Sequence, residues 1–211
     1  MDCIRITLFV FFVRLLMVCT LHAYVSVGSE APNFVAHDIN GQEVSLEKYK
    51  GRIVVLEWTN HRCPYVRKQY SKETNGGIGN MQAMQLRFTA DPANAVWITI
   101  DSTSSDEDSY LSVEGWKAQL EQWGAHPTTL IIDDGALIAD EYDVKRIPEV
   151  FVIDTAGELV YRGAVDSFRG ADPQEIEESS NLPWFKNAIE RTLQGRRVVP
   201  SETIPYGCSI R

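Results

Sequence analysis

The sequence predicts an α/β fold with a central mixed sheet flanked by helices. Apolar runs suited to buried strands alternate with runs of helical periodicity along most of the chain. That alternation is typical of a sheet whose strands are joined by helices. Near the end, two strand-like runs are separated only by the turn Asp154-Thr155-Ala156-Gly157. A short turn of this kind indicates a hairpin, which adds antiparallel strands at one side of the sheet.

The first predicted element is a β-hairpin within residues 31–51. It is closed at Asn40-Gly41, because an Asn-Gly pair favours a type I′ turn. A buried strand over 53–58 follows, and a helix begins at Pro64. The remaining elements are expected in this order: helix 79–88, strand 95–100, helix 112–123, strand 128–132, helix 136–142, strands 150–153 and 159–162, and helix 182–193.

The ends of the chain differ in character from the middle. Residues 1–23 are predicted to be a secretory signal peptide, because Arg5 precedes an apolar run that ends at Ala23. An uncleaved N-terminal anchor is the alternative. Residues 24–195 are predicted to form one domain, and residues 196–211 an extended tail that carries Cys208. The protein is therefore expected to be exported, either to a periplasm or outside the cell.

Composition excludes several kinds of partner. The chain has 20 Lys and Arg against 29 Asp and Glu, a net charge of −9. A protein with this negative charge is a poor ligand for nucleic acid or for an anionic membrane. No nucleic-acid partner is therefore expected, and no membrane contact beyond the export signal. The sequence has no glycine-rich phosphate loop, and the loop that holds His61 offers only one cysteine to a soft metal. No cofactor and no metal are expected.

Cys63 is the candidate catalytic residue. It lies where the strand 53–58 gives way to a helix, so its thiol is expected at a helix N-terminus. Unpaired N–H groups and the helix dipole favour the thiolate there, which is the reactive form. The alternative is a buried cysteine that serves as a small hydrophobe. Asn60, His61, Arg62 and Pro64 surround Cys63 with a polar loop, which favours the reactive interpretation.

The same loop is expected to tune the thiol. The side chains of His61 and Arg62 lie next to Cys63 in the sequence, and cations near a thiol lower its pKa. Asn60 could donate a hydrogen bond to a thiolate or to a bound hydroxyl. Arg67 and Lys68 are expected to be solvated surface residues.

Cys208 is the only other cysteine of the chain after residue 23. In an oxidising compartment it could act as a resolving thiol that attacks oxidised Cys63. It could also form a permanent structural bond with Cys63, or pair with another molecule. The sequence alone leaves these alternatives open.

Three separated features, in order, resemble the thioredoxin fold. They are Trp58 followed by Cys63-Pro64, then Ile147-Pro148, then the run VFVIDTAGELVYRGAV. More narrowly, the chain resembles the redoxin branch, the alkyl hydroperoxide reductase/thiol-specific antioxidant group. The string TNHRCPYVRK is similar to the N-H-x-C-P-Y-V segment of thioredoxin-family proteins of bacterial envelopes. The resemblance covers about residues 28–195, and the ending PYGCSIR is also similar to that subgroup.

The resemblance implies a role for Pro148, which would be cis and would face Cys63. A cis proline there would present a backbone edge to a bound disulfide or peptide. The alternative is a trans proline that begins the strand. Three departures from family patterns matter. Val66 replaces the second cysteine of C-x-x-C, and Asn60 stands where peroxiredoxins have a threonine. Pro148 also occupies the place of the peroxiredoxin arginine, with Arg146 two residues away.

These features lead to the expected function, an exported thiol-disulfide oxidoreductase with Cys63 as nucleophile and Cys208 as resolving thiol. Its partners would be protein thiols and disulfides or small peroxides, together with a reductant that the sequence does not identify. Two alternatives are a peroxiredoxin-like antioxidant peroxidase and a redox-inert thioredoxin-like module that binds a protein.

Overall fold

The structure, a computed structural model, describes residues 25–91, 94–178 and 180–210. The predicted signal peptide therefore lies outside the described residues. Within those three ranges, no helix is both long enough and apolar enough to span a bilayer.

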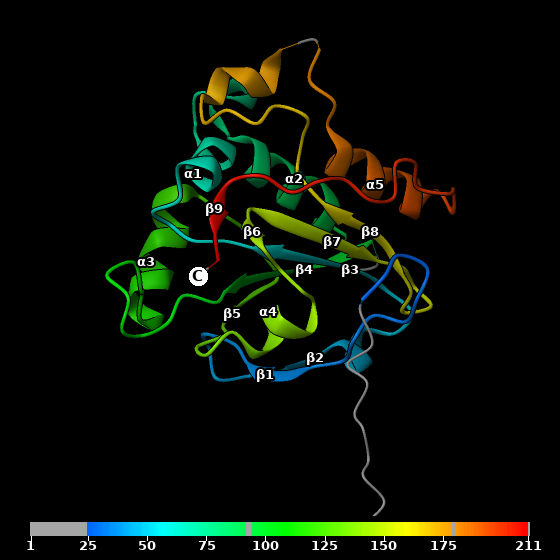
Figure 1. The fold of residues 1–211 in the computed structure, drawn as a ribbon, viewed down its shortest axis with the longest axis horizontal. Coiled ribbons are helices and arrows are strands. Elements are labelled where there is room, and N and C mark those ends of the chain that lie inside the picture. The colour runs from blue at the N-terminus through cyan, green and yellow to red at the C-terminus, as the bar shows by residue number, and fades with distance from the viewer. Residues whose placement is uncertain (1–24, 92–93, 179, 211) are drawn as a thin grey trace, which may run out of the picture.

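A mixed sheet of five strands forms the centre of the molecule, as the sequence predicts (Figure 1). Its strands stand in the order β5-β4-β3-β7-β8. The first three of these run parallel, and β7 is antiparallel to both β3 and β8. The bounds are β3 Ile53–Trp58, β4 Ala95–Asp101, β5 Thr129–Ile132, β7 Glu149–Ile153 and β8 Leu159–Gly163. Every residue of β3 and β4 is buried, because helices or loops cover both faces at the sheet centre.

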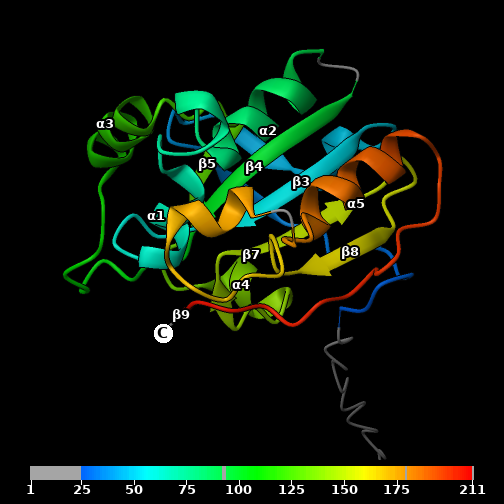
Figure 2. The same ribbon diagram turned by 90° about the horizontal axis from the view of Figure 1, so that it is seen from above.

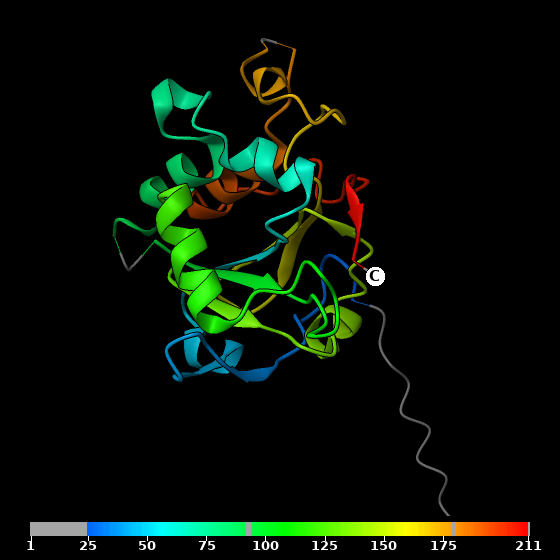
Figure 3. The ribbon, with the colours of Figure 1, turned by 90° about the vertical axis from the view of Figure 1, so that its left-hand side faces the viewer.

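Helices cover one face of the sheet, and a thinner layer covers the other (Figures 1 and 3). The helices α1 (Pro64–Tyr70), α2 (Asn80–Thr89) and α5 (Trp184–Leu193) lie on the first side. The short helix α4 (Leu137–Glu141) and the hairpin of β1 (Val35–His37) and β2 (Glu43–Ser45) lie on the second. Helix α3 (Val113–Trp123) packs Trp116 against Leu130 of the edge strand β5. Three 3-10 turns complete the elements: η1 Leu46–Tyr49, η2 Asn75–Gly77 and η3 Pro173–Glu177.

Local signals place most element ends correctly. Strand β3 has the predicted bounds and helix α1 the predicted start, because an apolar run ends in a polar loop and Pro64 can start a helix without a hydrogen-bonded N–H. Ser112 caps α3 by accepting a hydrogen bond from the Gly115 N–H, and Gly124 ends that helix in a left-handed conformation. The other predicted bounds differ from the observed ones by at most two residues.

The hairpin is confirmed, but its predicted type I′ turn is wrong. Such a turn needs a positive φ at both Asn40 and Gly41, and only Gly41 has one, at 75°. The Asp38 carboxylate accepts hydrogen bonds from the N–H groups of Asn40 and Gln42. Asp38 thus organises a longer loop through its side chain, and this local bond replaces the tight two-residue turn.

The C-terminal tail returns across the molecule to the active-site loop (Figure 2). It first pairs with β8, where the Arg162 N–H donates to Ser201 O and the Thr203 N–H donates to Arg162 O. It then forms strand β9 (Cys208–Ser209), which is antiparallel to β6 (Arg146–Ile147). A segment far away in sequence is thereby placed beside the start of α1.

Candidate active site

Cys63 lies at the junction that the sequence predicts. It is the N-cap residue of α1, and its carbonyl oxygen accepts a hydrogen bond from the Arg67 N–H. The residue is only 4% exposed and packs into the main hydrophobic core. Its sulfur lies 3.5 Å from the carbonyl oxygen of Ile147. The sulfur therefore lies against the backbone of Ile147.

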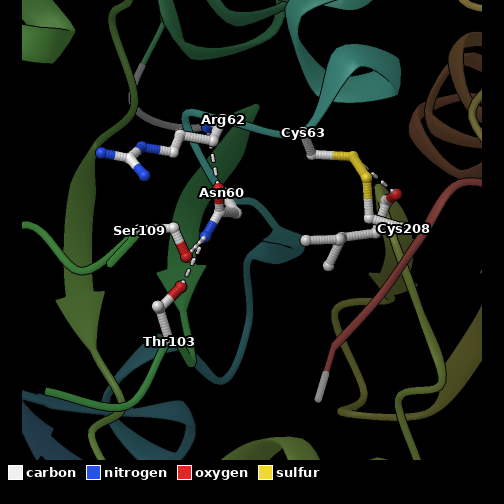
Figure 4. Close-up of a disulfide and its surroundings, with 7 residues drawn as sticks. Asn60, Arg62, Cys63, Thr103, Ser109 and Cys208 are labelled. Carbon is white, nitrogen blue, oxygen red and sulfur yellow. Dashed lines mark hydrogen bonds between the residues drawn. A yellow bond between two sulfur atoms is a disulfide. The ribbon is translucent and has the colours of Figure 1, made fainter. Parts of the chain in front are cut away.

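A disulfide joins Cys63 to Cys208 (Figure 4). The two Cα atoms are 6.1 Å apart, a separation that suits an ordinary disulfide. Cys208 is held opposite Ile147 by the pairing of β9 with β6. The tail thus reaches Cys63, and pairing of Cys208 with another molecule is not needed to explain its presence.

The Ile147–Pro148 peptide bond is cis, which confirms the expectation drawn from the resemblance. It follows directly after the residue whose backbone pairs with Cys208. The edge that was expected to receive a peptide is therefore occupied by the chain's own tail.

Asn60 organises the loop before Cys63. Its amide nitrogen donates to Thr103 Oγ1 at 2.7 Å and to Ser109 Oγ at 3.2 Å, and its side-chain oxygen accepts from the Arg62 N–H at 2.8 Å. Figure 4 shows the Asn60 side chain pointing toward Thr103 and Ser109. Both amide N–H groups are thus engaged by hydroxyls, and neither points to the sulfur in this oxidised form.

The two neighbours of Cys63 that were expected to tune its thiol differ in environment. His61 is partly buried, and its ring lies edge-on to Trp116 with centroids 6.3 Å apart. Burial, and then the nearby Arg62 charge, lower the pKa of His61, so the imidazole is neutral near pH 7. Arg62 is exposed, and its side chain extends away from the disulfide in Figure 4. Arg62 is therefore the cation of this loop.

Pro64 on α1 and Arg146 on β6 lie on either side of the disulfide. Pro64 is the exposed first residue of α1. Arg146 is exposed on β6, where its backbone pairs with Ser209 of the tail. The structure therefore brings both residues to the rim of the site, and any tuning by their side chains stays a prediction.

Lys68 is buried, so the expectation of a solvated side chain is wrong. It is 1% exposed, and its ammonium donates to the carbonyl oxygens of Phe168 and Gly170 and to Glu175 Oε2. It also lies 3.6 Å from Asp166 Oδ1. A buried ammonium needs such partners, and the loop before η3 supplies them.

Asp166 joins this buried cluster to the tail. Its carboxylate accepts hydrogen bonds from Gln69 Nε2 at 2.6 Å and from the Tyr206 hydroxyl at 2.7 Å. Tyr206 stands two residues before Cys208, and its ring lies edge-on to Tyr65 of α1. Sequence reasoning missed Lys68, Asp166 and Tyr206, because their contacts join segments between 40 and 100 residues apart.

A cavity of about 560 Å³ opens beside the disulfide. Its wall includes both cysteines, Ile147 and the loop that carries Asn60 and Arg62. The rest of the wall is mostly polar and comes chiefly from residues 102–109. Cavities of this size commonly bind small molecules in proteins.

Three carboxyl groups are buried in the sheet near the site. Burial raises the pKa of Glu57 on β3 to about 7, although three side chains donate hydrogen bonds to it. Burial also raises the pKa of Asp101 on β4 to about 6 and that of Glu149 on β7, where Arg162 opposes the shift. Among the described residues, no group of three or more His, Cys, Asp and Glu side chains is arranged to hold a metal ion.

Comparison with known proteins places this fold and site in a family. Residues 27–162 match the model of the AhpC/TSA family, which is more than half of the chain. The chain belongs to the AhpC/TSA family. The match begins just before β1 and ends on β8, so it includes the Cys63 loop and the cis proline.

The chain is also similar to individual proteins. The protein "Thiol-disulfide oxidoreductase ResA" of Bacillus subtilis (strain 168) is 25% identical over 136 residues. That match covers 64% of this chain and 66% of ResA, which is just under two thirds of the relative.

Solved structures show the same fold. An uncharacterized conserved protein from Geobacillus kaustophilus superposes with a TM-score of 0.68 at 24% identity, over 90% of this chain and 93% of that one. A thiol:disulfide interchange protein of the thioredoxin family from Chlorobium tepidum TLS superposes with a TM-score of 0.51 at 16% identity, over 80% and 98% of the two chains. The expected thioredoxin-like fold of the redoxin branch is thus confirmed.

Proposed function

We propose that this chain is an exported thiol-disulfide oxidoreductase in which Cys63 is the nucleophile and Cys208 the resolving thiol. The observation that carries the proposal is the Cys63–Cys208 disulfide, which lies against the backbone edge that ends at the cis proline Pro148. The similarity to ResA, a thiol-disulfide oxidoreductase by name, supports the same reaction class.

The geometry suits a reaction in two exchanges. In the reduced protein, the Cys63 thiolate attacks a sulfur of a partner disulfide, and a mixed disulfide forms while the partner's other sulfur leaves as a thiolate. Cys208, held by β9 opposite Ile147, then attacks the Cys63 sulfur. The Cys63–Cys208 bond forms, and the partner's second thiolate is released. A local C-x-x-C pair is not required, because the tail supplies the second thiol.

Trapping of the mixed disulfide tests this proposal. Reduced Cys208→Ser protein, mixed with a protein disulfide such as insulin, is expected to accumulate a covalent adduct at Cys63. Wild type should release reduced insulin chains, and Cys63→Ser should do neither. A wild-type protein that leaves insulin oxidised would favour a redox-inert module that binds a partner without chemistry.

Peroxide reduction is the second candidate, and membership of the AhpC/TSA family is the observation that favours it. A peroxide would oxidise the Cys63 thiolate to a sulfenic acid. The Cys208 thiol would then condense with this sulfenic acid to give the same disulfide. Consumption of hydrogen peroxide by the reduced protein, compared with Cys63→Ser, separates this reaction from disulfide exchange.

Export and chain organisation belong to the same proposal. Residues 1–23 would direct export, residues 24–195 would form the redoxin domain, and residues 196–211 would carry the resolving thiol. Mass spectrometry of the protein purified from a bacterial envelope fraction would locate the mature N-terminus. An N-terminus retained at Met1 in a membrane fraction would favour an uncleaved anchor.

A further inference from the structure

We propose that the cavity beside the disulfide binds a small thiol bearing both an ammonium and a carboxylate group, and that this thiol attacks Cys208 and not Cys63. The inference rests on the proposed function, because it identifies the class of reductant that would restore the two thiols. An amino-acid-type thiol such as cysteine or glutathione has the required chemistry.

The two sulfurs of the disulfide are unequally placed for attack. Cys63 is 4% exposed and belongs to the main core, where α1 and β3 hold it in place. Cys208 is only partly buried and sits on the two-residue strand β9. Both residues line the cavity. A thiolate that enters the cavity therefore meets the more exposed of the two residues, Cys208, first.

The cavity wall carries charges of both signs. Arg62 lines it, and the Arg62 guanidinium forms no ion pair with any residue that the structure describes. Asp106 and Glu107 line the same cavity from the loop after β4, and all three side chains are exposed. A guanidinium recognises a carboxylate, and a carboxylate recognises an ammonium group. A ligand with both groups therefore satisfies both sides of the wall.

Hydroxyl groups also line the cavity, beside apolar residues such as Ala136 and Ile210. Ser104 and Ser109 are partly exposed on its wall, and Ser109 is fixed by the hydrogen bond from Asn60. Such groups can hold the amide and carboxylate atoms of a small polar ligand. The arrangement gives a reason for Asn60 to engage Ser109 and Thr103: the three residues shape the wall opposite the disulfide.

The exchange balances with two molecules of thiol. The first thiolate bonds to Cys208 Sγ, the Cys63–Cys208 bond breaks, and its electron pair leaves on Cys63 as a thiolate. The second thiolate attacks the ligand sulfur of the mixed disulfide, so the ligand leaves as its own disulfide and Cys208 leaves as a thiolate. The protein disulfide is reduced by two electrons, and two molecules of thiol are oxidised.

Adduct mapping tests the site of attack in the wild-type protein. Oxidised protein is mixed with reduced glutathione in the presence of iodoacetamide, which alkylates each thiol as it is freed. Peptide mass spectrometry is expected to find glutathione on Cys208 and the alkyl group on Cys63. Glutathione on Cys63, with alkylated Cys208, would overturn the inference.

Kinetics test the charged wall. The rate of disulfide reduction is measured against glutathione and against 2-mercaptoethanol, a thiol without charged groups. Arg62→Gln is expected to lower the rate with glutathione about tenfold relative to the rate with 2-mercaptoethanol, the cost of one charge-assisted hydrogen bond. Any effect of Arg62 on Cys63 itself acts on both thiols and cancels in this ratio. Arg67→Gln is the matched control, because Arg67 is also exposed, on α1, but does not line this cavity. Equal effects on both thiols, or none on either, would overturn the inference.

These results are separable from those of the proposed function. Insulin reduction and adduct trapping by Cys208→Ser concern the reduced enzyme and a protein substrate. Suppose that insulin reduction and trapping succeed, but glutathione attacks both cysteines alike or reacts with Arg62→Gln as fast as with wild type. Then only the proposal of a small-thiol site fails. If neither partner exchanges with the protein, the oxidoreductase itself fails.

Discussion

Tyr206, which stands two residues before Cys208, donates a hydrogen bond of 2.7 Å to Asp166. Asp166 also accepts from Gln69 and lies 3.6 Å from the ammonium of Lys68, so the tail is fastened to two residues of α1. Since Cys63 is the N-cap residue of that same helix, one set of buried polar contacts fixes both ends of the disulfide relative to each other.

The Tyr206 hydroxyl should therefore raise the effective concentration of Cys208 at Cys63. Tyr206→Phe removes one hydrogen bond to a carboxylate, worth about 1.5–3 kcal/mol, so the disulfide should become at least tenfold easier to reduce. A redox titration against glutathione measures this equilibrium constant. Tyr49→Phe is the control, because its ring packs beside Arg52, away from the site. An unchanged equilibrium constant in Tyr206→Phe would show that the Tyr206–Asp166 hydrogen bond does not stabilise the disulfide.

Loss of the Lys68 ammonium should destabilise the whole protein. Lys68→Met would leave the Asp166 carboxylate and two loop carbonyls buried without their cation. Breaking a buried pair in this way costs about 3–5 kcal/mol, which urea unfolding measures. Lys117→Met changes an exposed lysine on α3 and should stay within about 0.5 kcal/mol of wild type. Equal stabilities of the two variants would refute the role of the buried cluster.

Gly207 should be required for closure of the tail. Its φ is 118°, and an added Cβ would overlap the carbonyl oxygen of Ile147. Gly207→Ala should keep β9 from pairing with β6, so mild oxidation should leave both thiols free where wild type forms the disulfide. Gly41→Ala is the control: its φ is also positive, at 75°, but nothing lies within 4 Å of an added Cβ. Thiol counting by alkylation and mass spectrometry decides the outcome, and normal closure in Gly207→Ala would contradict it.

Glu57 should make the free energy of unfolding depend on pH. Its pKa is raised from 4.5 to about 7 by burial, so the folded protein holds a proton that the unfolded chain loses between these pH values. Stability should therefore fall by about 3 kcal/mol as pH rises from 4.5 to 7, and then level off.

Comparison with Glu57→Gln isolates this contribution, since Asp101 and Glu149 also have raised pKa values and add to the same trend. The glutamine variant keeps the shape of the side chain but cannot titrate, so its decline between pH 4.5 and 7 should be smaller. Urea unfolding at several pH values measures both curves. Parallel curves would show that Glu57 does not titrate in this range.

Local patterns predicted the sheet and the Cys63 junction, while contacts between distant segments escaped prediction. The apolar run of β3 and the start of α1 at Pro64 depend on neighbouring residues alone, so both can be predicted from the local sequence. Burial of Lys68 depends on carbonyl groups of Phe168 and Gly170, about a hundred residues later.

The same distinction holds for turns and for the tail. The Asn40-Gly41 pair predicts a type I′ turn. The Asp38 side chain instead accepts hydrogen bonds from the loop backbone and stabilises a longer loop. Strands β6 and β9 contain two residues each, too few for any periodic pattern to be visible. Their pairing depends on the path of the tail, which local sequence does not determine.

The Cys63–Cys208 bond also turns most of the polypeptide into a covalent ring, since the two residues are 145 positions apart. A protease cut within the exposed residues 105–108, which lie inside this ring, would open it without separating the fragments. Such a nicked molecule would migrate as a single band on a denaturing gel while oxidised and as two bands once reduced.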